Sequence, residues 1–131
     1  MAESYVIGVD FGSDSVRALI VNTETGENVG QGVACYPRWK AGLYQHPEYS
    51  IFRQHPLDYL ESLEKCIMTA LAELTEEQKD HVIGIGVDTT GSTPVPVDKN
   101  GTPLALLDEF AENENAMFFL WKDHAAAAEA D

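Results

Sequence analysis

A short segment near the start of the chain combines a carboxylate, a glycine and hydroxyl side chains in a pattern that suits phosphate binding. The segment reads Asp10-Phe11-Gly12-Ser13-Asp14-Ser15-Val16-Arg17. Asp10 can face a hydrated Mg²⁺, and Gly12 lets the backbone approach an anion closely. The N–H groups that follow, with the hydroxyls of Ser13 and Ser15, can donate to phosphate oxygens. An ordinary hairpin turn held by a structural Arg–Asp pair is the alternative interpretation.

A second polar segment, Asp88 to Thr93, follows the strongest apolar run of the chain. Its hydroxyls can donate to and accept from a polyhydroxylated substrate, and Gly91 would let that substrate lie directly on the backbone. Open α/β sheets bind their ligands at the carboxyl ends of strands, which favours a binding role here. The alternative is a tight turn that uses the hydroxyls itself, with Asp88 capping local N–H groups.

Hydrophobic patterning predicts the elements that position these segments. We expect strands near residues 5–10, 15–22, 29–36 and 82–88, and a helix near 57–74. A stripe of large apolar residues at helical spacing marks the buried face of that helix, namely Leu57, Leu60, Leu63, Ile67, Leu71 and Leu74. His55 precedes Pro56 at the helix entry, where a capping role is expected. Residues 37–55 lack periodicity and predict a long loop or an insertion.

The strand at 82–88 is apolar on both faces, which predicts a central position parallel to the first strand and covered on each side. Asn100-Gly101 predicts a hairpin between residues 93–97 and 103–107. The expected order is β-β-β-α-β plus a hairpin, an α/β fold with a mixed sheet. This order matches the ribonuclease-H-like core of actin, hexokinases and sugar kinases.

Composition limits the possible functions. The 131 residues include 8 Lys plus Arg and 22 Asp plus Glu, a formal net charge of -14. Such a surface repels phosphate backbones and anionic lipid, so nucleic acid and membranes are not expected partners. No apolar run is long enough for a transmembrane helix, and acidic residues interrupt any signal peptide. Cys35 and Cys66 lack a C-x-x-C spacing, and the sequence predicts a cytoplasmic chain with Cys66 buried.

The segment Asp10 to Arg17 resembles the first phosphate motif, D-x-G-[ST]-x-S-x-R, of the FGGY carbohydrate kinases. The run Val87-Asp88-Thr89-Thr90-Gly91-Ser92-Thr93-Pro94 resembles the L-ribulokinase branch of that family, as do residues 36–39, 110–113 and 120–124. The match runs through nearly the whole chain in one register. The resemblance therefore implies an actin-like kinase fold and transfer of a phosphoryl group from ATP to L-ribulose, a step of L-arabinose catabolism, with Mg²⁺.

The resemblance also implies roles for particular residues. Nucleotide contacts would come from Asp10, Gly12, Ser13, Asp14, Ser15 and Arg17, with Asp10 on the metal side. Sugar contacts would come from Thr89, Thr90, Gly91, Ser92 and Thr93, joined by Trp121 and Asp123 of the Trp-x-Asp stretch. No residue of this chain is assigned as the catalytic base, which lies downstream in the family.

The expected partners are thus a small sugar and a nucleotide, and homo-oligomerisation of a longer parent protein stays open. Residues 1–131 correspond to an incomplete first lobe, so we expect the chain alone to be inactive. Two alternatives stay open as well. One is another FGGY kinase, specific for xylulose or glycerol, and the other is a non-catalytic actin-like binding module.

Overall fold

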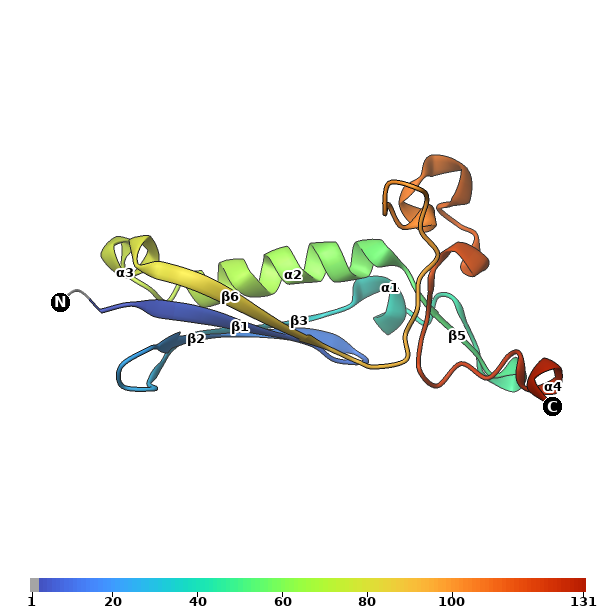
Figure 1. The fold of residues 1–131 in the computed structure, drawn as a ribbon, viewed down its shortest axis with the longest axis horizontal. Helices are drawn as coiled ribbons and strands as arrows, with labels where there is room; N and C mark the ends of the chain where they lie inside the picture. The colour runs from blue at the N-terminus through green and yellow to red at the C-terminus, as the bar shows by residue number, and fades with distance from the viewer. Residues whose placement is uncertain (1–2) are drawn as a thin grey trace. The chain divides into compact units, whose positions relative to one another are not determined.

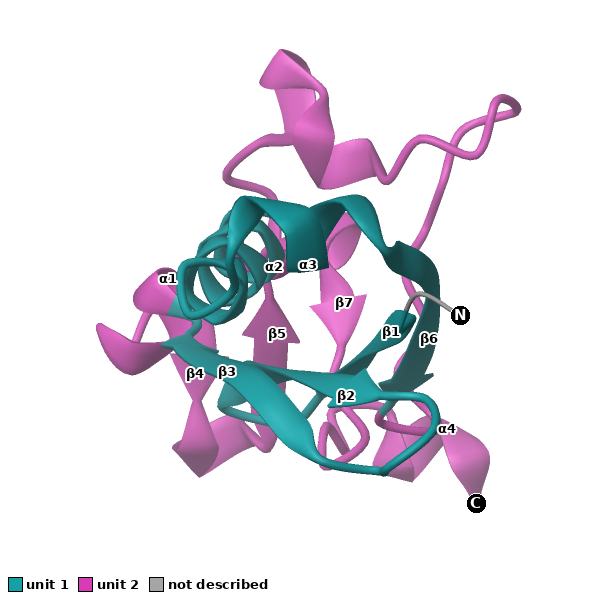
Figure 2. Cartoon of the chain, turned by 90° about the vertical axis from the view of Figure 1, so that its left-hand side faces the viewer, with its two compact units in different colours: residues 1–36, 60–89 teal, residues 37–59, 90–131 magenta. Residues whose placement is uncertain are grey.

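The computed structural model describes residues 3–131. They form two compact units, distinguished by colour in Figure 2. Unit 1 comprises the chain up to Tyr36 together with Leu60–Thr89, and unit 2 comprises Pro37–Tyr59 and Thr90–Asp131. Each unit contains its own sheet.

Unit 1 is built on a four-stranded mixed sheet in the order β3-β2-β1-β6 (Figure 1). The strands are β1 (Tyr5–Phe11), β2 (Ser15–Asn22), β3 (Asn28–Cys35) and β6 (Val82–Thr89). β2 is antiparallel to both β1 and β3, while β6 is parallel to β1. The predicted strands and the parallel pairing are confirmed.

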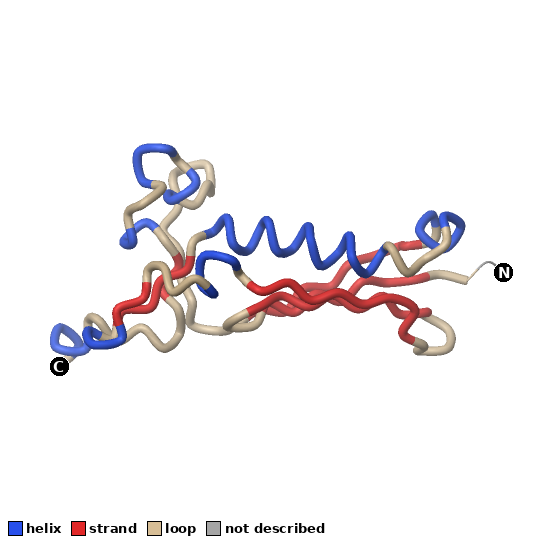
Figure 3. Tube along the Cα trace, turned by 180° about the vertical axis from the view of Figure 1, so that it is seen from behind, coloured by secondary structure: helices blue, strands red, loops and turns tan. Residues whose placement is uncertain are grey.

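Helix α2 (Pro56–Leu71) lies along one face of this sheet (Figure 3), and α3 (Glu76–Asp80) follows before β6. Beneath α2, alternate side chains of β1 and β2 are buried, as the period of a half-covered strand requires. They are Tyr5, Ile7, Val9, Val16, Ala18 and Ile20. A Thr75–Gln78 capping box begins α3.

The face that α2 turns toward the sheet differs from the predicted stripe. Leu60 is 52% exposed, whereas Cys66 and Ala70 are fully buried. The reason lies in β3, where a Cβ added at Gly32 would stand 2.1 Å from the carbonyl oxygen of Cys66. The helix backbone therefore approaches β3 so closely that only small side chains fit between them.

The prediction of a covered, central β6 was wrong for this chain. Among the described residues β6 has one hydrogen-bonded neighbour, β1, so it lies at the edge of the sheet. Ile83, Ile85 and Val87 are 70%, 56% and 60% exposed. The apolar run correctly indicates a strand, but neither α2 nor α3 buries these side chains.

Unit 2 contains a small sheet in the order β4-β5-β7, formed by Gln45–His46, Ile51–Gln54 and Phe118–Phe119. Its helices are α1 (Pro37–Lys40), α4 (Ala127–Ala130) and the 3₁₀ turns η1 (Pro47–Tyr49), η2 (Leu104–Leu106), η3 (Asp108–Phe110) and η4 (Glu114–Ala116). Its core contains Ala105, Ala116 and Met117.

The stretch 37–55, predicted as a long loop or an insertion, is structured. Side-chain contacts hold it in place of a periodic apolar pattern. The buried Asp58 accepts from the Arg38 guanidinium at 2.9 Å and from the Trp39 N–H at 3.0 Å.

The expected hairpin around Asn100-Gly101 is reduced to a tight turn. Asp98 Oδ1 accepts the N–H groups of Asn100 and Thr102, and a single β-bridge joins Val97 to Pro103. Pro94, Pro96 and Pro103 lack the N–H groups that a ladder needs, so paired strands do not form. Across residues 3–131, no helix has the length and apolar character needed to cross a membrane.

Candidate nucleotide and sugar site

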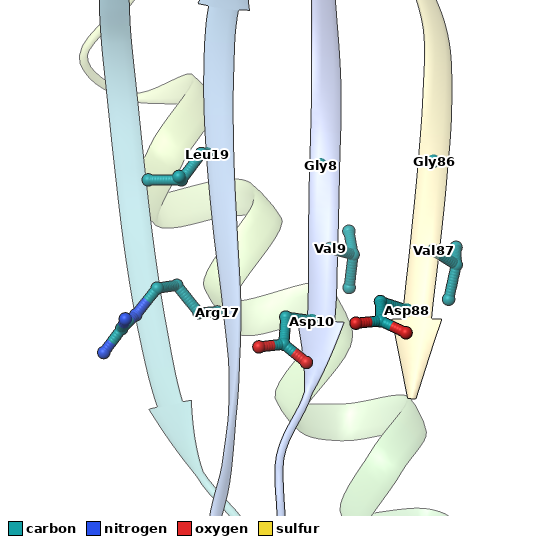
Figure 4. Close-up of a pocket in the computed structure, with 8 residues that line it drawn as sticks. All are labelled: Gly8, Val9, Asp10, Arg17, Leu19, Gly86, Val87 and Asp88. Atoms are coloured by element: carbon teal, nitrogen blue, oxygen red, sulfur yellow. The ribbon is translucent and has the colours of Figure 1, made fainter. Parts of the chain in front are cut away.

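The sheet register of unit 1 brings Asp10, Arg17 and Asp88 together on the face opposite α2. Asp10 pairs with Arg17 across the β1–β2 ladder and with Asp88 across the parallel β1–β6 ladder. Figure 4 shows the carboxylates of Asp10 and Asp88 next to each other, while the Arg17 side chain extends away from Asp10 toward β3. Arg17 therefore does not form with Asp10 the structural Arg–Asp pair that the alternative interpretation expected.

These residues line a hollow of about 520 Å³ in unit 1 (Figure 4). Its lining consists of Gly8, Val9, Asp10, Arg17, Leu19, Gly86, Val87 and Asp88. A Cβ added at Gly8 or Gly86 would meet no atom within 4 Å, so both glycines leave the floor of the hollow open. The hollow thus offers paired carboxylates above a flat backbone floor.

The turn after β1 is held by its own backbone and by Tyr36, the residue that follows β3. The Gly12 N–H donates to the Ser15 carbonyl at 2.9 Å, so this N–H closes the hairpin. The hydroxyl of Tyr36, a fully buried residue, donates to the Gly12 carbonyl at 2.9 Å, and the Tyr36 N–H donates to the Asp14 carbonyl. Tyr36 is a supporting residue whose role the sequence pattern did not reveal.

At the end of β6, Asp88 has a local role. Its Oδ1 accepts the N–H of Thr89 at 3.0 Å. The hydroxyls of Thr90 and Thr93 lie 3.2 Å apart, and Thr93 donates to the Gly91 carbonyl at 3.0 Å. Two of the candidate hydroxyls therefore contribute to the turn, as the alternative interpretation expected.

Ser92 is the member of this loop that lines a cavity in unit 2. Its φ of 51° is in the left-handed region, which a serine rarely adopts. With Trp121 and Asp123 it lines a hollow of about 340 Å³, which also includes Pro94 and His124. The Phe119 N–H donates to the Pro94 carbonyl at 2.9 Å and ties the loop to β7.

The hollow of unit 2 is lined by residues of two segments that were predicted separately, the loop with Ser92 and the stretch with Trp121 and Asp123. Trp121 is 52% exposed and presents an aromatic surface, which packs well on sugar C–H groups. Asp123 is instead buried in an ion pair with Arg53, at 2.7 Å. Burial opposes ionisation of Asp123, but hydrogen bonds from Arg53, Phe52 and Ala125 outweigh it and lower the pKa of this carboxyl.

His55 takes a structural position. His55 Nδ1 accepts the Leu57 N–H at 3.1 Å, and its Nε2 lies 2.9 Å from the Ala111 carbonyl oxygen. The predicted capping role at the start of α2 is confirmed. Within residues 3–131, no group of three or more His, Cys, Asp or Glu side chains is arranged to hold a metal ion.

Comparison with known proteins identifies the family. Residues 5–117 match the model of the N-terminal domain of the FGGY family of carbohydrate kinases. The chain belongs to this family. A gluconate kinase from Lactobacillus acidophilus has a similar fold, with a TM-score of 0.71 and 13% identity over 98% of this chain and 22% of that one. The FGGY resemblance and the sugar-kinase fold inferred from the motifs are confirmed.

Two relatives of this FGGY chain show its place within the family more finely. A ribulokinase from Vibrio parahaemolyticus is 59% identical over 129 residues, covering 98% of this chain and 23% of the relative. A ribulokinase from Halalkalibacterium halodurans is 37% identical over 137 residues, covering 100% of this chain and 24% of the relative. The chain thus spans about a quarter of the length of these relatives.

Proposed function

We propose that this chain forms the N-terminal part of the first lobe of an ATP-dependent, cytoplasmic kinase that converts L-ribulose to L-ribulose 5-phosphate. The observation that carries the proposal is the 59% identity to a ribulokinase across 98% of this chain. The terminal phosphoryl group of ATP would pass to a sugar hydroxyl, leaving ADP. The partners are a sugar and a nucleotide, and the net charge of -14 disfavours nucleic acid and anionic membranes.

The hollow of unit 1 has the donor chemistry that a Mg²⁺-nucleotide requires. Mg²⁺ commonly binds through one or two carboxylates, water and substrate phosphates, so Asp10 is a suitable ligand without a larger acidic cluster. Bound there, Mg²⁺ would neutralise charge on the transferring phosphoryl group. The turn residues, namely Gly12, Ser13, Asp14, Ser15 and Arg17, would bind and orient the phosphates.

We assign sugar contacts to residues 89–93 and Trp121, whereas the carboxylate of Asp123 is buried against Arg53. Trp121 would stack on C–H groups of the sugar, and Ser92 would face the same hollow. Gly91 does not line the hollow, but a Cβ there would meet no atom within 4 Å. Its open backbone is where we expect the sugar to approach.

A chimera tests the proposed function. Residues 1–131 would replace the aligned segment of the Vibrio parahaemolyticus ribulokinase, which shares 59% identity with them. A coupled assay with ATP, Mg²⁺ and L-ribulose should give turnover on the usual scale of about 1–10³ s⁻¹. Xylulose and glycerol should be poor substrates.

The 131-residue chain alone is the matched control. We expect it to give no turnover, because none of its carboxylates is assigned as the general base. A folded chimera that prefers xylulose or glycerol would contradict the substrate assignment. A folded chimera with no kinase activity would favour a non-catalytic role for this segment.

A further inference from the structure

The carboxylate of Asp123 is occupied by protein donors. Its Oδ2 accepts the Phe52 N–H at 2.8 Å and Arg53 Nε at 2.7 Å, and its Oδ1 accepts the Ala125 N–H at 3.1 Å. The side chains of Asp123 and Arg53 are each 6% exposed. A sugar hydroxyl would have to compete with charge-assisted hydrogen bonds for these oxygens. The carboxylate is therefore better suited to holding the chain than to holding a ligand.

Arg53 connects Asp123 to the rest of unit 2. Its Nη1 donates to the Glu114 carbonyl at 3.1 Å and to Asn115 Oδ1 at 2.9 Å. Its guanidinium carbon lies 3.7 Å from the centre of the Phe119 ring. A planar guanidinium with several fixed donors can hold such an arrangement in one geometry, which a lysine cannot.

Backbone hydrogen bonds connect the residues on either side of Trp121 to β5 and to the segment that precedes β5. The Leu120 N–H donates to the Phe52 carbonyl at 3.1 Å, and the His124 N–H donates to the Ser50 carbonyl at 2.9 Å. The Asp123 N–H also closes a turn on the Leu120 carbonyl at 2.7 Å. Trp121 is the half-exposed residue within this turn, and its indole lines the hollow.

We infer that Arg53 is a positioning residue for the sugar-side hollow, and that it acts through Asp123 to hold Trp121 in place. The claim that this hollow binds a sugar rests on the proposed function, but the positioning of Trp121 does not. Two consequences follow from this arrangement. Loss of Arg53 and loss of the Asp123 charge should have the same effect, and the effect should be present before any sugar is added.

The first test measures acrylamide quenching of tryptophan emission in the 131-residue chain without sugar. Trp39 is 8% exposed and Trp121 is 52% exposed, so the accessible emission belongs to Trp121. A Trp121→Phe variant verifies this assignment by removing that component. Arg53→Gln and Asp123→Asn should each raise the quenching constant toward that of a fully exposed indole. The double variant should quench no more than either single one.

Two further variants serve as controls. Arg53→Lys keeps the charge but replaces the planar guanidinium with a single ammonium group, so its quenching should lie between wild type and Arg53→Gln. If Arg53→Gln unfolds, as judged by circular dichroism, Arg53→Lys and Asp123→Asn still decide the question. Glu114→Gln removes the negative charge from the neighbouring, more exposed contact with His46, at 2.7 Å, and should leave the quenching constant unchanged.

The second test measures kinetics in the chimera. Arg53→Lys and Asp123→Asn should both raise the KM for L-ribulose, by about 10- to 100-fold, with a smaller change in kcat. Unchanged quenching in all folded variants, with an increase in KM only for Asp123→Asn, would make Asp123 a direct sugar ligand and overturn the inference. If the chimera does not phosphorylate L-ribulose, the proposed function fails, while quenching still decides the positioning claim.

Discussion

At the scale of single residues, the clearest division of roles lies between four aspartates. Asp10 is exposed on a rigid strand, and Asp88 beside it caps the next N–H of its own chain. Asp58 and Asp123 are buried and bound to arginines and backbone N–H groups. Exposure and partners, and not residue type, separate the candidate metal ligand from the structural anchors.

Replacing Asp10 tests its assignment to the metal side. In the chimera, Asp10→Asn should lower kcat by about 10- to 100-fold and raise the Mg²⁺ concentration required, because one negative charge is lost at the metal. The KM for L-ribulose should change little. Glu76→Gln, at an exposed carboxylate in unit 1, is the matched control and should leave the Mg²⁺ requirement as it is. If Asp10→Asn and wild type required the same Mg²⁺ concentration, the assignment of Asp10 to the metal side would be wrong.

Tyr59 provides a prediction about pH. Burial, with a smaller contribution from the Asp58 charge, raises the pKa of Tyr59 from 10.0 to about 12. The folded state thus holds this proton more tightly than the unfolded state, and the resulting stability is fully present below pH 10.0 and lost as pH rises toward 12. Titration of tyrosinate absorbance should show a late component that Tyr59→Phe removes. The free energy of unfolding of Tyr59→Phe should fall less steeply over that range; an identical slope would contradict the assignment.

Sequence motifs predicted Asp10 and its turn because those residues lie close together in the chain. The roles of Tyr36 and Arg53 were not predicted, for the opposite reason. Each acts on a segment distant in sequence, Tyr36 on Gly12 and Arg53 on Asp123. No local pattern marks a residue for a contact with a segment distant in the sequence, so such contacts become visible only once the fold is known.

At the scale of elements, glycines decide how α2 meets the sheet. Helical spacing predicted the helix correctly but selected its large apolar residues as the buried face. Gly30 and Gly32 on β3 face α2, and an added Cβ would come within 2.5 Å and 2.1 Å of helix carbonyl oxygens. Close packing of backbone on backbone therefore outweighs the burial of leucine side chains along this line of contact.

Gly32→Ala tests this packing. The new methyl group would collide with the Cys66 carbonyl, so the helix must shift, and we expect a loss of about 1–3 kcal/mol in the free energy of unfolding. Gly86→Ala, on a strand of the same sheet, is the matched control because its Cβ would meet no atom within 4 Å. Its effect should stay within about 0.5 kcal/mol. Urea unfolding that shows equal stability for both variants would refute the close contact.

At the scale of the whole molecule, the chain carries a candidate half-site in each unit. The phosphate turn and Asp10 belong to unit 1, and the hollow with Ser92 and Trp121 belongs to unit 2. The sequence predicts each of these chemistries separately, because each motif is local. It could not predict that β6 lies at an edge, because its apolar faces indicate suitability for burial and not the presence of a neighbour.

The assignment of the two half-sites is tested most sharply by the KM values for L-ribulose and for ATP in the Gly91→Leu chimera. A leucine would occupy the open space where we expect the sugar to meet the backbone, whereas the phosphate turn is a separate segment. Thermal melting must first show that the variant is folded. We expect a raised KM for L-ribulose and a nearly unchanged KM for ATP. A folded variant with weakened ATP binding and unchanged L-ribulose binding would show that the two half-sites are assigned the wrong way round.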